Sequence, residues 1–342
     1  MLNRRSLLSR AGLAAGALAM GVSFGAGSAQ AQESYLLTTA STGGTYYPVG
    51  VALATLVKVR LQNSNGIDMS AISSAGSGEN IKLLREGEAH FAILQGLFGA
   101  YARTGTGPIA SDGPQENLRS ITMLWPNVEH FVIRSSFVDT GTISDMGALE
   151  GRAVSLGAQN SGTIGSNRTI LGNLGIDIDT FYELVYAGYN PSADALQNGQ
   201  IDAMSTPAGA PVTAVSRVFA AMGSDATLLS FTDEQIVEAN GDFGSLWVAY
   251  NVPAGTYPGV DSDIQTIAQP NFLAVSADVP EETVYLITKT IFENLDFLRN
   301  IHPATSEMSL QTALGGLPLP LHPGALRYFE EAGLTIPDAL RP

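Results

Sequence analysis

Strand-like and helix-like runs alternate near the start of the chain, and this alternation restricts the possible folds more than any other feature. The spacing of apolar residues predicts strands and helices in turn, over Ser34–Thr39 (strand), 44–61 (helix), Ile67–Ser73 (strand), Glu79–Glu86 (helix) and His90–Leu94 (strand). Units of about 30 residues with this order indicate a largely parallel α/β sheet. Such sheets bind ligands at the carboxyl ends of their strands, where loops lead into helices.

An internal echo indicates that these units recur later in the chain. The stretch 84–92 resembles 196–204, and 149–156 likewise has a glycine between a helix-like and a strand-like run. Each is predicted to be a helix that ends at a glycine in the left-handed conformation and is followed by a strand. Because no Pro-, Gly- or Ser-rich linker separates the repeats, we expect two similar lobes joined by crossing strands.

The first 31 residues have the composition of an export signal. Three arginines stand within the first ten residues, an Ala- and Gly-rich apolar stretch follows, and Ala29-Gln30-Ala31 is a small-x-small cleavage site. Arg4-Arg5-Ser6-Leu7-Leu8 looks like the core of a twin-arginine signal. A membrane anchor is the alternative, but the glycines make the stretch only weakly hydrophobic. We therefore expect residues 1–31 to be a cleaved signal peptide and the mature protein to be periplasmic.

The charge balance and the lack of cysteine exclude several classes of function. The net charge is −15 for the whole chain and −18 without residues 1–31, which argues against nucleic acid and anionic membrane surfaces as partners. The chain has no cysteine, so disulfides, thiolate metal ligands and cysteine nucleophiles are excluded. Its three lysines against 14 arginines fit either a GC-rich genome or a salt-adapted surface.

None of the candidate catalytic or metal-binding motifs has the sequence context or spacing that its chemistry requires. The nucleophile-elbow pattern at 21–25 falls within the signal peptide, and Pro108 interrupts a dinucleotide-like loop at 105–110. The four histidines are scattered without metal-ligand spacing, and we expect His90 and His130 to be core residues. We therefore expect no catalytic residue, no metal, no cofactor and no enzymatic activity.

Three segments combine glycine with small hydroxyl or amide residues just before a predicted helix: 41–46, 74–80 and 159–163. The first amides of a helix lack partners and carry a partial positive charge, while glycine lets a ligand approach the backbone. Ordinary helix capping explains any one segment equally well. Because all three follow predicted strands, together they favour a cleft that binds a small anion. Gln95 follows another strand and adds an amide at the same edge.

The same segments carry a family resemblance that extends over the mature chain. Residues 42–50, Thr-Gly-Gly-Thr-Tyr-Tyr-Pro-Val-Gly, resemble the T-G-G-x-Y-Y-P-x-G opening of TAXI receptors, the TRAP-associated extracytoplasmic solute-binding proteins. Similar matches follow in order at 76–80, 160–163 and 253–259, and 316–325 looks like the closing signature of that family. In that closing segment the prolines predict an extended stretch that docks the C-terminus, with Gly324 freeing a turn before the next helix.

The resemblance implies a fold and a partner. It implies a two-lobed periplasmic-binding-protein fold of the type II class, α/β with two crossing strands and a ligand cleft between lobes that close by hinge motion. Lobe I would combine 33–133 with 270–342, and lobe II would be 134–269. The partner would be a TRAP membrane permease with fused small and large subunits, and the receptor itself a monomer. Ligands in the family are small organic acids and acidic or amide amino acids.

The motif positions, taken together with the loops, name the ligand-binding candidates: Gly44, Thr45, Tyr46, Ser77, Asn80, Gln95, Asn160, Ser161, Gly162 and Thr163. We expect Ser77 and 161–163 to bind carboxylate oxygens, while Gln95 and Tyr46 contact the remaining polar group of the ligand. No motif arginine is predicted to reach the cleft, so the charge would be recognised by helix ends. There are three alternatives. The protein could be a receptor for a neutral polar solute, a sensory protein, or an extracytoplasmic hydrolase. A hydrolase would need a nucleophile beside a base.

Overall fold

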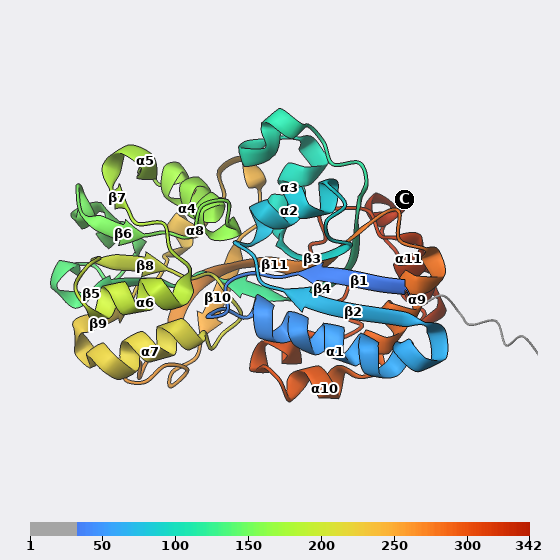
Figure 1. Ribbon diagram of the computed structural model, residues 1–342. Coiled ribbons are helices and arrows are strands. Elements are labelled where there is room, and N and C mark those ends of the chain that lie inside the picture. Colours follow the sequence, from blue (N-terminus) through green and yellow to red (C-terminus); the bar gives the residue numbers. More distant parts are fainter. Residues whose placement is uncertain (1–32) are drawn as a thin grey trace, which may run out of the picture. The chain divides into compact units, whose positions relative to one another are not determined.

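A computed structural model describes residues 33–342, and the predicted signal peptide with its motifs lies outside the described residues. The described chain forms two β-sheets flanked by helices (Figure 1). The strands of the first sheet are β1 (Glu33–Thr38), β2 (Ile67–Ile72), β3 (Phe91–Gln95), β4 (Leu118–Val128), β10 (Val248–Val252) and β11 (Ile264–Ser276). Those of the second are β5 (Phe131–Arg134), β6 (Ala153–Ser155), β7 (Glu183–Leu184), β8 (Ala203–Ser205) and β9 (Ala226–Leu228).

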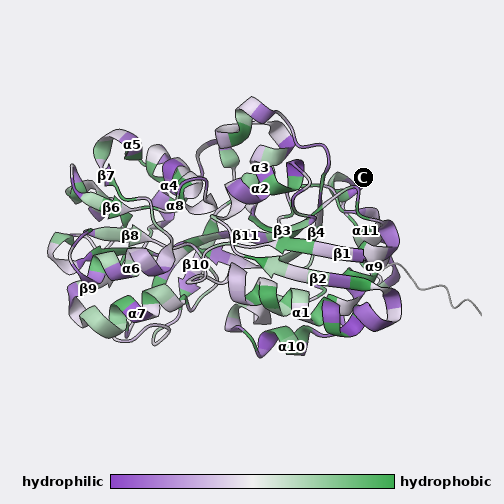
Figure 2. Ribbon diagram, in the orientation of Figure 1, coloured by the Kyte–Doolittle hydropathy of each residue, from purple (hydrophilic) through white to green (hydrophobic). Residues whose placement is uncertain are grey.

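Helices cover the sheets. Around the first sheet lie α1 (Tyr46–Asn65), α2 (Ser77–Arg85), α3 (Gly96–Thr104), α9 (Glu281–Phe292), α10 (Leu295–Arg299) and α11 (Pro323–Glu331). Around the second lie α4 (Gly162–Asn173), α5 (Ile178–Phe181), α6 (Tyr189–Gln197), α7 (Thr213–Met222) and α8 (Asp233–Asn240). Strand β3 is entirely buried, and Figure 2 colours the middle of its sheet as hydrophobic.

The predicted alternation over residues 34–94 is confirmed element by element as β1, α1, β2, α2 and β3. Strand β1 pairs in parallel with both β2 and β3. The predicted left-handed glycines are also present, since Gly87, Gly151 and Gly199 have φ angles of 72°, 68° and 71°. A side chain is strained in this conformation, so glycine ends the preceding turn and redirects the chain into a strand.

The prediction of largely parallel sheets is only partly right, because both sheets are mixed. Strand β11 is antiparallel to β3, β4 and β10, and β5 is antiparallel to β8 and β9. The reason is the crossing between the sheets: β4 leaves the first sheet and β11 runs back into it, so the two strands have opposite directions. The predicted lobe limits remain a prediction.

The chain passes from β4 to β5 through two buried residues, Glu129 and His130. The Glu129 N–H donates to the Ile267 carbonyl at 2.8 Å, and Thr266 Oγ1 donates to the Glu129 carbonyl at 2.8 Å. His130 is a core residue as predicted, with Nδ1 2.8 Å from the Val128 carbonyl and Nε2 2.7 Å from the Tyr257 hydroxyl. The two crossing strands are therefore tied to each other where they pass between the sheets.

The C-terminal segment docks on the first sheet, as the prolines predict. The Ser120 N–H donates to the Pro320 carbonyl at 2.8 Å, and the His322 N–H returns a bond to the Ser120 carbonyl at 2.9 Å. Gly324 does not free a turn, because it lies inside α11, where a Cβ atom would overlap the carbonyl oxygen of Glu281. In residues 33–342 no helix combines the length and the apolar character needed to cross a membrane.

Candidate functional site

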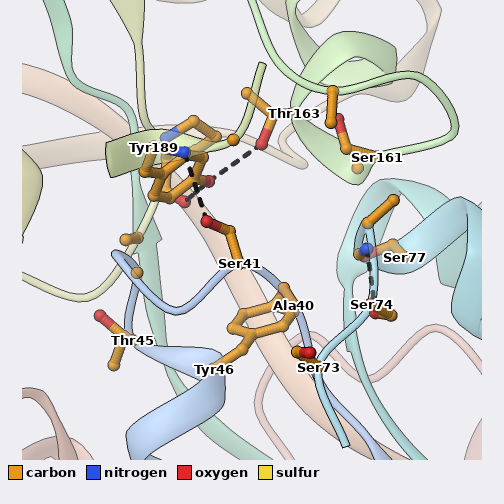
Figure 3. A pocket seen from close by; sticks show the side chains of 18 of the residues that line it. Ala40, Ser41, Thr45, Tyr46, Ser73, Ser74, Ser77, Ser161, Thr163 and Tyr189 are labelled. Carbon is orange, nitrogen blue, oxygen red and sulfur yellow. Dashed lines mark hydrogen bonds between the residues drawn. The ribbon is translucent and has the colours of Figure 1, made fainter. Parts of the chain in front are cut away.

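A cavity of about 350 Å³ lies where helices from both sheets begin. Loops after β1 and β2 lead to the starts of α1 and α2, and loops after β6 and β7 lead to the starts of α4 and α6. Because β1 runs parallel to β2, and β6 runs parallel to β7, these loops leave matching edges of their sheets. Figure 3 shows Thr45 and Tyr46 at the start of α1, opposite Ser161 and Thr163 at the start of α4.

The lining of the cavity contains many polar side chains but no charged one among the described residues. Among the described residues it consists of Ala40, Ser41, Thr42, Gly44, Thr45, Tyr46, Ser73, Ser74, Ala75, Gly76, Ser77, Gln95, Asn127, Ala158, Ser161, Gly162, Thr163, Gly188, Tyr189, Pro191, Pro207 and Ala208. No Lys, Arg, His, Asp or Glu is in this set. The helices that begin here are 9 to 20 residues long, and each presents its positive end to the cavity.

Three serine hydroxyls of the lining have a proton to donate. Ser77 Oγ accepts the Gln95 N–H at 3.2 Å, and Ser161 Oγ accepts the Ile164 N–H at 3.1 Å as the N-cap of α4. Ser41 Oγ accepts the Tyr189 N–H at 3.3 Å (Figure 3). Each oxygen uses a lone pair for a backbone amide, which leaves its O–H free to bond an acceptor in the cavity.

Eight of the ten residues predicted from the sequence line this cavity: Gly44, Thr45, Tyr46, Ser77, Gln95, Ser161, Gly162 and Thr163. The lining and the hydrogen bonds divide these residues into two groups. Ser77 and Ser161, at the starts of α2 and α4, supply free hydroxyls, and Gly44 supplies partly exposed backbone, whereas Gly162 is buried. The other polar side chains are already bonded within the protein.

Thr45, Tyr46, Gln95 and Thr163 are the members of that bonded group, with Thr163 Oγ1 2.9 Å from the Tyr189 hydroxyl. Thr45 Oγ1 donates to the Gly209 carbonyl at 2.9 Å, and the Tyr46 hydroxyl donates to Asn271 Oδ1. Burial raises the pKa of Tyr46 well above its usual value, so its hydroxyl stays protonated. Gln95 Nε2 donates to the Gly162 carbonyl at 2.8 Å. Their side chains therefore shape the cavity more than they offer free donors.

Asn80 and Asn160 lie outside the lining. Asn80 is fully buried behind the 74–80 loop, where its Nδ2 donates to the Thr39 and Ile93 carbonyls at 2.7 and 2.9 Å. Asn160 has a φ angle of 60°, and its carbonyl accepts the Glu79 N–H at 3.0 Å. Asn80 thus braces one loop, while the backbone of Asn160 joins the start of α4 to α2.

The lining also contains residues outside the predicted set, and Tyr189 and Asn127 are two of these that bring polar side chains from elements other than the predicted loops. The Tyr189 hydroxyl donates to the Pro207 carbonyl at 2.6 Å and lies 2.9 Å from Thr163 Oγ1 (Figure 3). A helix start after a short strand, Gly188-Tyr189, was the available signal. Asn127 is 1% exposed within β4, and the signal was a polar residue in an apolar strand.

A second hollow of about 500 Å³ lies along α2 and α4 and is lined by charged side chains. Arg85 is 2.7 Å from Asp112 in an ion pair, and Arg168 is 2.7 Å from Asp179. These cations are neutralised by their neighbours. In the described part of the chain no cluster of His, Asp or Glu could hold a metal ion.

The chain is similar to known proteins in sequence and in fold. The NMT1-like family matches residues 37–333. A protein from Bordetella bronchiseptica RB50 shares the fold with a TM-score of 0.51 at 13% identity, over 90% of each chain. MatC from Rhodopseudomonas palustris, solved with bound malate, has a TM-score of 0.50 at 14% identity over 88% of this chain and 96% of its own. The alkanesulfonate-binding protein SsuA from Xanthomonas axonopodis pv. citri, bound to MOPS, is a weaker likeness, with a TM-score of 0.45 at 13% identity over 87% of this chain and 90% of its own. The predicted two-lobed periplasmic-binding-protein fold is confirmed.

Proposed function

Since this chain belongs to the NMT1-like family and has the fold of periplasmic binding proteins, we propose that it is a receptor that captures a small carboxylate in the cavity between its two sheets. One observation carries the proposal: four helices direct their N-terminal ends at a cavity whose described lining has no charged side chain. Helix ends and free hydroxyls stabilise an anion without a cationic side chain.

The nearest buried acid does not oppose an anion at neutral pH. Glu129 is close enough to Tyr46 and Tyr189 to contribute to their raised pKa values. Burial raises the pKa of Glu129 itself to about 8, so its carboxyl group is mostly neutral at pH 7. The field in the cavity is then set by the helix ends.

The fate of the ligand follows from the motif resemblance. We propose that lobe I (33–133 with 270–342) and lobe II (134–269) close on the carboxylate in the periplasm. The receptor, a monomer freed of its signal peptide, would deliver the ligand to a TRAP permease with fused small and large subunits. The bound malate of MatC supports an organic acid as ligand for this fold. The described lining offers no His or carboxylate as a general base, so the proposal includes no catalysis.

Isothermal titration with mono- and dicarboxylates tests the function, with the corresponding amides and sugars as neutral solutes. We expect heat of binding for carboxylates alone. Ser77→Ala and Ser161→Ala should each weaken binding about tenfold, because each removes a hydrogen bond to a charged group. The exposed Ser64→Ala on α1 is the matched control. Heat from a neutral solute but from no carboxylate would refute the proposal.

A further inference from the structure

Asn127 brings an unpaired polar atom to the cavity. Its side chain is 1% exposed and lines the cavity near the end of β4. Among the buried side-chain atoms of the described lining, its Oδ1 is the one without a hydrogen-bond partner. A buried polar atom without a partner is costly, and native proteins rarely keep one that has no role.

A chain of amides determines which atom of Asn127 is unpaired. The Gly162 carbonyl can only accept, so Gln95 turns its Nε2 toward it at 2.8 Å, with Ser166 Oγ at 2.9 Å from the same nitrogen. Gln95 Oε1 consequently faces Asn127 and needs a donor, which is Asn127 Nδ2 at 3.3 Å. The oxygen of Asn127 is therefore left as an acceptor, and no reversal of either amide improves this arrangement.

The neighbouring donors of the lining do not compensate this acceptor. The Tyr46 hydroxyl is bonded to Asn271, Thr45 Oγ1 to the Gly209 carbonyl, and the Tyr189 hydroxyl to the Pro207 carbonyl. The free hydroxyls of Ser41, Ser77 and Ser161 do not bond Asn127 Oδ1 either, so an occupant of the cavity can supply its partner.

We propose that Asn127 is a specificity-determining residue, which selects carboxylates that also carry a hydrogen-bond donor such as a hydroxyl, ammonium or amide group. The inference rests on the proposed function, because the helix ends and the free serine hydroxyls hold the carboxylate. The donor then reaches Asn127 Oδ1. A carboxylate without a donor leaves that oxygen unpaired, and rejection of ligands that lack a required donor is among the strongest forms of discrimination.

The same amide chain connects ligand recognition to the contact between the sheets. Gln95 ends β3 of the first sheet, whereas Gly162 and Ser166 belong to α4 beside the second. A donor on Asn127 polarises the bond from Asn127 to Gln95 and, through it, the bonds from Gln95 to α4. Ligands with a donor should therefore also strengthen the contact between β3 of the first sheet and α4 beside the second.

Matched pairs of ligands test the proposal on the mature protein by isothermal titration. The pairs are propanoate with lactate, succinate with malate, and glutarate with 2-hydroxyglutarate and glutamate. In the pair that fits the cavity best, we expect the protein to bind the donor-bearing member at least ten times more tightly than the donor-lacking one. Asn127→Ala should reduce this preference to less than threefold, while the donor-lacking member binds as it does to the wild type. The exposed Asn251→Ala is the matched control and should keep the preference.

The outcomes separate this inference from the function on which it rests. Carboxylates that bind with equal affinity in every pair overturn the role of Asn127 and leave the receptor function standing. Binding of no carboxylate overturns both. The comparison within pairs uses wild-type protein, so it decides the question even where Asn127→Ala fails to fold. A preference that persists undiminished in a folded Asn127→Ala protein also overturns the role of Asn127.

Discussion

The adjacent residues Glu129 and His130 should give the protein an unusual dependence of stability on pH. Both are fully buried where the chain crosses between the sheets. Burial raises the pKa of Glu129 to about 8, against the weaker opposing effect of hydrogen bonds from groups such as the Trp247 indole. Burial lowers the pKa of His130 to about 4. Both side chains are therefore neutral in the folded protein over most of the range between these values.

The two residues affect stability with opposite signs. Between the ordinary carboxyl pKa of 4.5 and about 8, folded Glu129 keeps a proton that the unfolded chain loses, so stability falls as pH rises. Between about 4 and the ordinary imidazole value of 6.5, unfolded His130 binds a proton that the folded protein excludes, so stability rises with pH. The two slopes cancel between about pH 4.5 and pH 6.5, so stability should fall only from about pH 6.5 to about pH 8.

Glu129→Gln removes one slope and keeps a neutral side chain of the same shape. Relative to the wild type, the folding equilibrium of the variant should shift toward the folded state by a factor of about ten for each pH unit above 4.5. It should level off near pH 8, at a gain approaching roughly 5 kcal/mol if the whole shift is realised.

Urea unfolding at half-unit steps from pH 4 to 9 measures this difference, in which the contributions of all other groups cancel. The exposed Glu238→Gln on α8 is the control, and its profile should run parallel to that of the wild type. A Glu129→Gln difference that stays constant across the range would mean that the buried carboxyl is ionised in the folded state, and the reasoning would be refuted.

Two further predictions concern close backbone contacts. A Cβ on Gly78 would lie 2.5 Å from the Asn160 carbonyl oxygen, so Gly78→Ala should separate α2 from α4 and weaken ligand binding about tenfold with little loss of melting temperature. Gly147→Ala, with nothing within 4 Å of the added carbon, is its control in titration calorimetry. Gly324→Ala should instead lower the unfolding free energy by about 2 kcal/mol or more, measured by urea unfolding, because its Cβ would overlap the Glu281 carbonyl. Unchanged affinity of Gly78→Ala would contradict the first prediction, and unchanged stability of Gly324→Ala would contradict the second.

How much of the site could be predicted depended on whether the signal was local. Small residues before a helix are a local pattern, and Ser77 and Ser161, which this pattern singles out, both line the cavity. The bonding partners of Gln95 are 67 and 71 residues away in the chain. Nothing near Gln95 in the sequence shows that its amide is already engaged, or that Asn127 is thereby left with a free acceptor.

The role of Asn80 was missed for a related reason. Its motif resembles a ligand-binding turn, but the side chain points at the carbonyls of Thr39 and Ile93. These carbonyls belong to β3 and to the residue after β1, and their position depends on parallel pairing of the two strands. Local sequence predicts that an amide lies at the start of a helix. The sheet decides whether the amide faces the ligand or the core.

The strongly acidic composition is compatible with the proposed binding of an anion in the cavity, because the net charge and the helix ends act over different ranges. The chain carries a net charge of −15, yet charges on its surface are screened over about 8 Å at physiological salt. Helix ends act at contact distance, inside a cavity whose described lining carries no charge of its own. The net charge should therefore slow the approach of an acid at low salt, whereas in our proposal the helix ends, the serine hydroxyls and Asn127 decide the affinity. Composition alone would have argued against the ligand class that the local geometry favours.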